Sequence, residues 1–121
     1  MIPEKLSLFS DMKFPSKLGE ISIPDHTKEA LDNYFLKGYE PGSFLTGVLT
    51  NDLVRAVNSA DMQNRHAIYE IVKWLITERN VPPGSWGCAE NMVTWLKDIG
   101  GVRTKFVDKL EKEYIWEALK A

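Results

Sequence analysis

The sequence predicts an all-α protein, a compact bundle of about five helices preceded by an extended N-terminal arm. From residue 25 onward, apolar residues recur at spacings of three and four, which is the period of an amphipathic helix. Proline, glycine and aspartate interrupt these stretches at places suited to helix ends. The length of 121 residues fits one domain. We divide it into an arm, residues 1–24, and a helical domain, residues 25–121.

The arm differs from the rest of the chain because three prolines interrupt it and no helical stripe persists. Residues 20–23 alternate in polarity, which is typical of a short strand. The arm also carries large apolar side chains that could pack on the helices or on a partner, namely Leu6, Leu8, Phe9, Met12 and Phe14.

The first two helices are predicted from caps and apolar stripes. Asp25 is a suitable N-cap for the first, and Gly38 supplies its C-terminal stop. Pro41 fits the first turn of the second helix, where its missing N–H costs nothing. The apolar spacing then continues without a break to about Ala60, so we expect one long helix there.

Three further helices follow. Asp61 is expected to cap the third, and the short connection favours an antiparallel hairpin with the second. Pro82-Pro83-Gly84 breaks the chain, after which Ser85 can cap a fourth helix. Gly100-Gly101 ends the fourth, and a heavily charged fifth helix extends from about Val102 to Lys120.

Composition excludes several classes of protein. Apolar residues make up 44% and charged residues 26% of the chain, an ordinary globular composition. The net charge of −2 disfavours a nucleic-acid coat, since phosphate binding needs a basic excess. A single cysteine suits a reducing compartment, and neither a secretory signal nor a run of ~20 apolar residues is present. We therefore expect a cytoplasmic protein with no membrane segment.

The most informative polar residue is Asp52. On a helical wheel it falls inside the apolar arc of the second helix, where a carboxylate is costly unless it is paired. The same exercise places Asn64 and Arg65 on the inward side of the third helix. Asn51, Asp52, Arg65 and His66 could therefore meet between the two helices. They form either a structural polar network or a ligand site, and only the second reading leaves some of them open to solvent.

A second candidate site is the entry to the fourth helix, Ser85 and Trp86. Free N–H groups at a helix start can bind an anion, and a tryptophan can stack on a base. However, the segment lacks the Gly-Lys-Ser/Thr ending of a phosphate loop. Ordinary helix entry, with Trp86 as a core residue, is the competing interpretation.

Catalysis and metal binding have no positive sequence signal. Cys88 would need His66 or His26 beside it to act as a nucleophile, and nothing in the spacing supports that arrangement. Two histidines and one cysteine without close pairing do not make a zinc ligand set. We expect no catalytic residue, no metal and no cofactor.

The hairpin also permits a helix-turn-helix interpretation. Gln63, Asn64 and Arg65 at the start of the third helix are chemically able to contact base edges. The acidic balance of the chain and the inward placement of two of these residues oppose it. A DNA-binding regulator therefore stays as the alternative function.

The end of the last helix predicts an interface. Ile115, Trp116 and Leu119 point in different directions and make this tip apolar nearly all round. It would dock on a second copy or on a partner, or else pack against the arm of its own chain. We expect a homo-oligomer.

Several short motifs occur in one order along residues 21–99. They are Ile23-Pro24-Asp25-His26-Thr27, Ala30-Leu31, Gly42, Phe44-Leu45, Asn51-Asp52-Leu53, Asn64-Arg65 and Gly84-Ser85-Trp86-Gly87. Together they resemble a family of small proteins of unknown function encoded by tailed bacteriophages. In that family a serine is common where this chain has Cys88, which argues further against a catalytic thiol.

The resemblance implies a phage product that acts in the bacterial cytoplasm. Small non-enzymatic phage proteins often inhibit a host enzyme, redirect host machinery or block a defence system, in some cases by sequestering a nucleotide signal. We therefore expect a non-enzymatic accessory protein that binds and neutralises a host factor, with a host protein or a small nucleotide as its partner.

Overall fold

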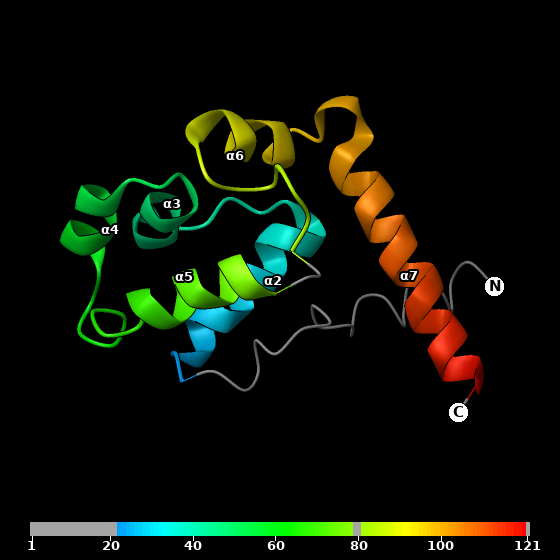
Figure 1. Cartoon of the computed structure of the whole chain (residues 1–121), viewed down its shortest axis with the longest axis horizontal. Helices are drawn as coiled ribbons and strands as arrows, with labels where there is room; N and C mark the ends of the chain where they lie inside the picture. Colours follow the sequence, from blue (N-terminus) through cyan, green and yellow to red (C-terminus); the bar gives the residue numbers. More distant parts are fainter. Residues whose placement is uncertain (1–21, 79–80, 121) are drawn as a thin grey trace.

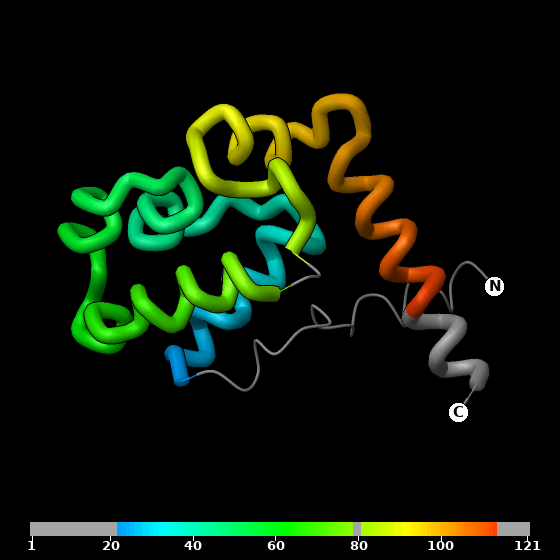
Figure 2. The backbone as a smooth tube through the Cα atoms, in the orientation of Figure 1, coloured from blue at the N-terminus to red at the C-terminus, as the bar shows by residue number. Residues whose placement is uncertain are grey.

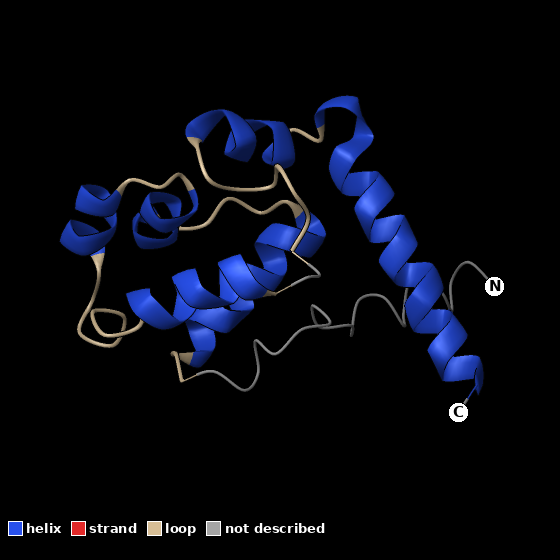
Figure 3. Ribbon diagram, in the orientation of Figure 1, coloured by secondary structure: helices blue, strands red, loops and turns tan. Residues whose placement is uncertain are grey.

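The computed structural model describes residues 22–78 and 81–120, with side chains up to residue 113 (Figure 2). Throughout this part of the chain the regular structure is helical and no strand occurs, which confirms the all-α fold (Figure 3). The helices are α2 (Asp25–Lys37), α3 (Ser43–Leu49), α4 (Leu53–Ser59), α5 (Ile68–Thr77), α6 (Ala89–Leu96) and α7 (Val102–Lys120), with a 3₁₀ helix η2 (Ile99–Gly101) before α7.

Most of the predicted arm lies outside the described residues. At its end, Ser22 and Ile23 form a bend rather than part of a strand. Figure 1 shows α3 and α4 at one end of the molecule, α2 and α5 through its middle, and α7 as a long helix at the other end.

Helix α2 follows its sequence pattern closely. Asp25 is its first residue rather than its N-cap, and the acidic side chain suits the positive end of the helix dipole. The buried side is formed by Leu31, Tyr34 and Phe35. The helix ends where Gly38 adopts a φ of 69°, a left-handed conformation that costs glycine little.

An aromatic cluster joins four helices in the core. Phe35 of α2 contacts Trp74 of α5 and Trp95 of α6 in edge-on geometry, with centroid distances of 6.0 and 6.2 Å. Trp95 also contacts Phe106 of α7 at 5.6 Å. The indole N–H of Trp95 donates to the Tyr34 carbonyl at 2.9 Å, so this buried polar group is satisfied.

The expected single helix from Pro41 to Ala60 is wrong, because the chain turns between α3 and α4. Asn51 adopts a φ of 62°, and the N–H groups of Asn51 and Asp52 donate to the carbonyls of Val48 and Gly47. This pair of bonds is the Schellman ending of a helix. The Asp52 carboxylate then accepts from the Arg55 N–H at 3.1 Å and caps α4.

Gly47 makes the turn between α3 and α4 possible. A Cβ atom at this position would lie 2.5 Å from the Ala56 backbone nitrogen and 2.8 Å from the Ala56 Cα atom. The two helices therefore pack backbone against backbone at this point, and Ala56 is the buried residue of α4.

The third predicted helix begins later than expected. Asp61 does cap a turn, accepting from the Asn64 N–H at 2.7 Å, but residues 62–67 form turns and α5 starts at Ile68. Asn64 is buried as predicted, and its Oδ1 accepts from the Thr27 hydroxyl at 2.7 Å. This contact ties the segment to the start of α2. The expected hairpin with a short connection does not form, because α4 ends at Ser59 and α5 begins only at Ile68.

The junction of α6 and α7 is held by Asp98 and Arg103. The Asp98 carboxylate accepts from the N–H groups of Arg103 and Thr104 and from the Thr104 hydroxyl, which caps α7. The Arg103 guanidinium donates to the carbonyls of Trp95 and Leu96 at the end of α6. α7 begins at Val102, as predicted, although α6 begins at Ala89 rather than after Ser85.

Candidate interaction surface

Helix α5 has two apolar sides. Ile71, Trp74 and Leu75 face the core and are buried. On the other side Tyr69 and Ile76 are 67% and 68% exposed. A core-facing stripe explains only the first set, so the second set is free for another contact.

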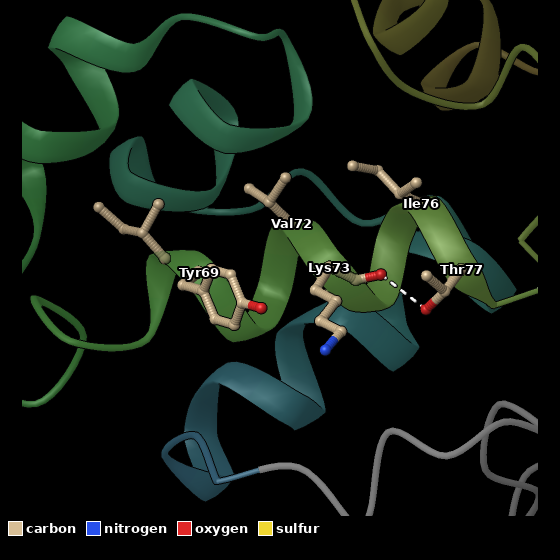
Figure 4. A pocket seen from close by; sticks show the side chains of 6 residues that line it. Tyr69, Val72, Lys73, Ile76 and Thr77 are labelled. Carbon is tan, nitrogen blue, oxygen red and sulfur yellow. Dashed lines mark hydrogen bonds between the residues drawn. The ribbon is translucent and has the colours of Figure 1, made fainter.

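The exposed side of α5 forms a shallow groove of about 440 Å³. Its lining is Ile68, Tyr69, Val72, Lys73, Ile76 and Thr77. Figure 4 shows Val72 and Ile76 directed toward α3, while Lys73 points away from α3 across the opposite edge of the helix. The Lys73 ammonium lies 5.6 Å from the centroid of the Tyr69 ring. The groove is therefore apolar with a cation at one edge.

Helix α4 also has an exposed apolar side. Ala56 is the buried residue of the helix, and Leu53, Val54 and Val57 are 67%, 78% and 58% exposed. These three residues occupy positions i, i+1 and i+4 and so share one side of α4.

A small hollow of about 50 Å³ connects the two helices. Leu53 lines it together with Ile68 and Val72, which also line the α5 groove. We call the combined surface the α4–α5 strip. It consists of the lining residues Leu53, Ile68, Tyr69, Val72 and Ile76, together with Val54 and Val57, which share the exposed side of α4 with Leu53.

The predicted placement of Asp52 on the buried stripe is wrong. Asn51 and Asp52 do line the small hollow, but both are exposed, and Asp52 acts as the cap of α4. The physical reason is the break at Asn51. Because the chain leaves the axis of α3 there, the helical wheel of α3 no longer applies after residue 51. Asp52, expected inside the apolar arc, therefore lies at the start of α4.

Arg65 is also exposed rather than inward, and so is His66. Both lie in the turns before α5, and neither lines the hollow that contains Asn51 and Asp52. The buried polar contact in this region instead joins Thr27 to Asn64, with the His26 ring 3.5 Å from the Asn64 amide nitrogen and 3.7 Å from the Asp61 carboxylate. The four residues are therefore not brought together into the expected site.

Ser85 and Trp86 pack against the core instead of opening a helix. Ser85 is fully buried, its hydroxyl donates to the Pro82 carbonyl at 2.6 Å, and its own carbonyl accepts from the Tyr34 hydroxyl at 2.7 Å. Trp86 is half-buried against the core. The Gly87 N–H donates to the Leu49 carbonyl, which ties this loop to the end of α3.

Among the described residues, one phenol and one carboxyl group have shifted pKa values. Burial raises the pKa of Tyr34 far above its ordinary value, with nearby Arg103 acting in the opposite direction. The hydrogen bond from the Thr104 hydroxyl is the largest cause of a lowered pKa at Asp98. Both groups serve structural contacts already described.

The remaining predicted residues divide into two groups. Ile115, Trp116 and Leu119 have side chains outside the described part of the structure, so the predicted interface there stays a prediction. Cys88 is exposed at the start of α6. Within the described residues, no cluster of three or more histidine, cysteine, aspartate or glutamate side chains could hold a metal ion.

The α4–α5 strip was missed from the sequence, although a signal was present. Seven of the ten residues of α5 are apolar or aromatic, more than one core-facing stripe requires. Such a helix is either buried on all sides or has a second partner, and the structure favours the second explanation.

No family model matches the chain. No solved structure matches it either. In the described part of the chain, none of the helices combines the length and the apolar character needed to cross a bilayer.

Proposed function

We propose that this is a non-enzymatic phage accessory protein that binds a host protein, and that the α4–α5 strip is the binding surface. The occupant we propose is an amphipathic helix of that host protein. The observation that carries the proposal is the pair of exposed apolar faces on α4 and α5, joined through Leu53, Ile68 and Val72. The phage context and the host partner come from the resemblance of the sequence motifs.

The chemistry of the lining supports a helix as the occupant. Ile68, Val72 and Ile76 recur every four residues along α5 and form a ridge of one helix. A partner helix can lay its apolar side along such a ridge, with anchors at i, i+3, i+4 and i+7. Lys73 at the edge of the groove favours a carboxylate on the flank of the partner.

A protein partner fits the groove better than a nucleotide does. Lys73 is the charged residue in its lining, whereas a nucleotide needs several groups to bind its phosphates. Arg65 and Trp86, which belong to the two ligand sites expected from the sequence, do not line either hollow of the strip.

The test compares capture by two matched variants. Ile76→Lys places a charge in the strip, and Ile99→Lys makes the same change at a residue that is 52% exposed in η2, outside the strip. We expect a bacterial protein that is captured by the wild type and by Ile99→Lys but lost with Ile76→Lys. The helical segment of that protein, as a purified peptide, should then bind the wild type.

Equal capture by both variants would contradict the proposal, as would a purified partner that binds through a segment without an apolar helical face. Since Ile76 and Ile99 are both exposed, neither change creates a cavity, and circular dichroism checks that both variants keep the helical fold.

A DNA-binding regulator is the second candidate, and the turn between α3 and α4 favours it. Two seven-residue helices are joined by Thr50, Asn51 and Asp52, a connection of the length found in helix-turn-helix motifs. Arg55 and Asn58 are exposed on α4 and could contact DNA. This candidate predicts strongly salt-dependent retention on duplex DNA, and absence of retention at low salt would exclude it.

A further inference from the structure

We infer that in the absence of the partner a second copy of this chain occupies the α4–α5 strip, so that the free protein is a two-fold dimer with α5 packed on α5. The inference rests on the proposed function, because it assigns a second occupant to the same surface. The partner helix would then bind in competition with the second copy.

The occupant is chosen because α5 itself has the chemistry that the strip accepts. Its ridge consists of exposed Ile76 and half-buried Ile68 and Val72, with exposed Tyr69 and Lys73 on one flank. Two copies of this ridge present apolar surface to each other along the full length of α5. A two-fold contact requires such self-complementarity, since the same patch is used on both copies.

The size of the strip is sufficient for a dimer. Its five most exposed side chains are each 58% to 78% accessible. At roughly 100 Å² apiece they present about 500 Å² of apolar surface. Homodimer interfaces are about 65% apolar, so the corresponding contact covers roughly 800 Å² per copy. That is the area of a standard stable interface.

The charges at the two edges decide the direction of the pairing. Asp52 lines the hollow on the α4 edge, beside Ile68 and Val72. Lys73 lies on the opposite edge, and its ammonium reaches back over Tyr69, one turn toward the start of α5. The two charges therefore lie at similar heights along α5, on opposite sides of it.

A two-fold axis that runs parallel to α5 leaves the height of each residue along the helix unchanged. It places the α4 edge of one copy opposite the Lys73 edge of the other. Each Lys73 then faces Asp52 of the second copy, and the apolar side of α4 lies over the Tyr69 edge of that copy. An axis perpendicular to α5 would instead place Lys73 against Lys73. Charge complementarity thus selects the arrangement with the two α5 helices parallel.

The test is the mass of the full chain in solution, measured by sedimentation equilibrium at about 1 to 100 µM, the range of a moderate interface. We expect the wild type and Ile99→Lys to approach twice the chain mass of 13.8 kDa, and Ile76→Lys to remain at 13.8 kDa. A wild type that stays monomeric throughout would overturn the inference, and so would a dimer that survives Ile76→Lys.

A double-mutant cycle tests the pairing direction. Lys73→Ala and Asp52→Asn should each weaken the dimer about three- to five-fold, the range of a partly exposed ion pair. Asparagine keeps an oxygen that can cap α4. The two changes together should weaken the dimer no more than one alone, because they remove the same pair. Independent, multiplicative losses would overturn the parallel arrangement.

The outcomes separate this inference from the proposed function. A monomeric wild type that still captures a host protein through Ile76 removes the dimer and leaves the proposed function intact. A dimer that is abolished by Ile76→Lys, with host capture unchanged by the same variant, keeps the dimer and contradicts the proposed function.

Discussion

Gly47→Ala tests the close packing of α3 on α4, which positions the strip. In an ordinary helix the change would stabilise the protein by up to about 1 kcal/mol, because alanine has the higher helix propensity. Here the new methyl would lie 2.5 Å from the Ala56 nitrogen and 2.8 Å from the Ala56 Cα atom. Ordinary carbon contacts are about 3.5–4.0 Å, so the two helices must separate by roughly 1 Å.

Overpacking of this kind costs about 1–3 kcal/mol, and the atoms that the methyl meets belong to backbone that cannot rotate away. After the gain in propensity, we expect a net loss of about 1–2 kcal/mol in the free energy of unfolding. With a urea dependence near 2 kcal/mol per molar, the midpoint of unfolding should fall by roughly 0.5–1 M. Circular dichroism at fixed protein concentration measures it.

Two control variants follow from the identity of the atoms that the new methyl would meet. Ala56→Gly in the same chain should not restore stability, because glycine retains the nitrogen and Cα atoms that the methyl meets. Gly42 precedes α3 with a φ of −71°, and a methyl added there would have no atom within 4 Å, so Gly42→Ala lacks the steric loss. A midpoint for Gly47→Ala equal to or above that of the wild type would refute the reasoning.

Three further predictions concern structural contacts of α2 and of the junction between α6 and α7. Gly38→Ala should lower the free energy of unfolding by about 1–2 kcal/mol, since the φ of 69° is unfavourable for alanine and a methyl would displace the Arg103 guanidinium. Thermal unfolding measures the loss, and an unchanged midpoint would contradict the prediction. Tyr34→Phe should cost about 1–2 kcal/mol in urea unfolding by leaving the buried Ser85 carbonyl without its donor. Burial raises the pKa of Tyr34, so the contribution of the neutral phenol to stability is complete below its ordinary pKa of 10.0 and is lost as pH rises above that value. The free energy of unfolding of the wild type should therefore fall in alkali more steeply than that of Tyr34→Phe. Parallel curves for the two proteins would count against this. The lowered pKa of Asp98 has the opposite effect on the pH dependence. The contribution of the Asp98 carboxylate to stability is present above its ordinary pKa of 3.8 and is lost as pH falls through the lowered pKa. Asp98→Asn should therefore flatten the acid limb of the stability curve.

The elements predicted best are those whose caps and apolar period agree. α2 ends at Lys37 with Gly38 as its C-cap, and α7 begins at Val102, as expected. In α2 the stripe and the terminal glycine both indicate the same boundary, and in the charged last helix the preceding glycine pair marks the start. Local and tertiary preferences coincide at these places, so the sequence is sufficient.

The break between α3 and α4 was missed because two signals conflicted. The apolar spacing continues through Val48, Leu49 and Leu53 and favours one long helix. Asn51 and Asp52 favour a left-handed helix end followed by a new cap, and they prevail because Gly47 allows the backbones to meet. An Asn-Asp pair a few residues after a helical glycine was the available signal.

The binding surface could not be located from the sequence for a related reason. Periodicity shows that α5 has apolar residues on more than one side, but it does not say which side packs in the core. That choice is made by the aromatic cluster, where Trp74 contacts Phe35. Only after this contact is known do Tyr69 and Ile76 become the exposed side.

The most direct test of the proposed binding surface is an amide chemical-shift map of the full chain on addition of the purified partner that Ile99→Lys retains and Ile76→Lys loses. We predict that the largest shift changes lie in Leu53–Ser59 and Ile68–Thr77, the residues of α4 and α5. Changes concentrated in α6 or α7, with α5 unaffected, would contradict it.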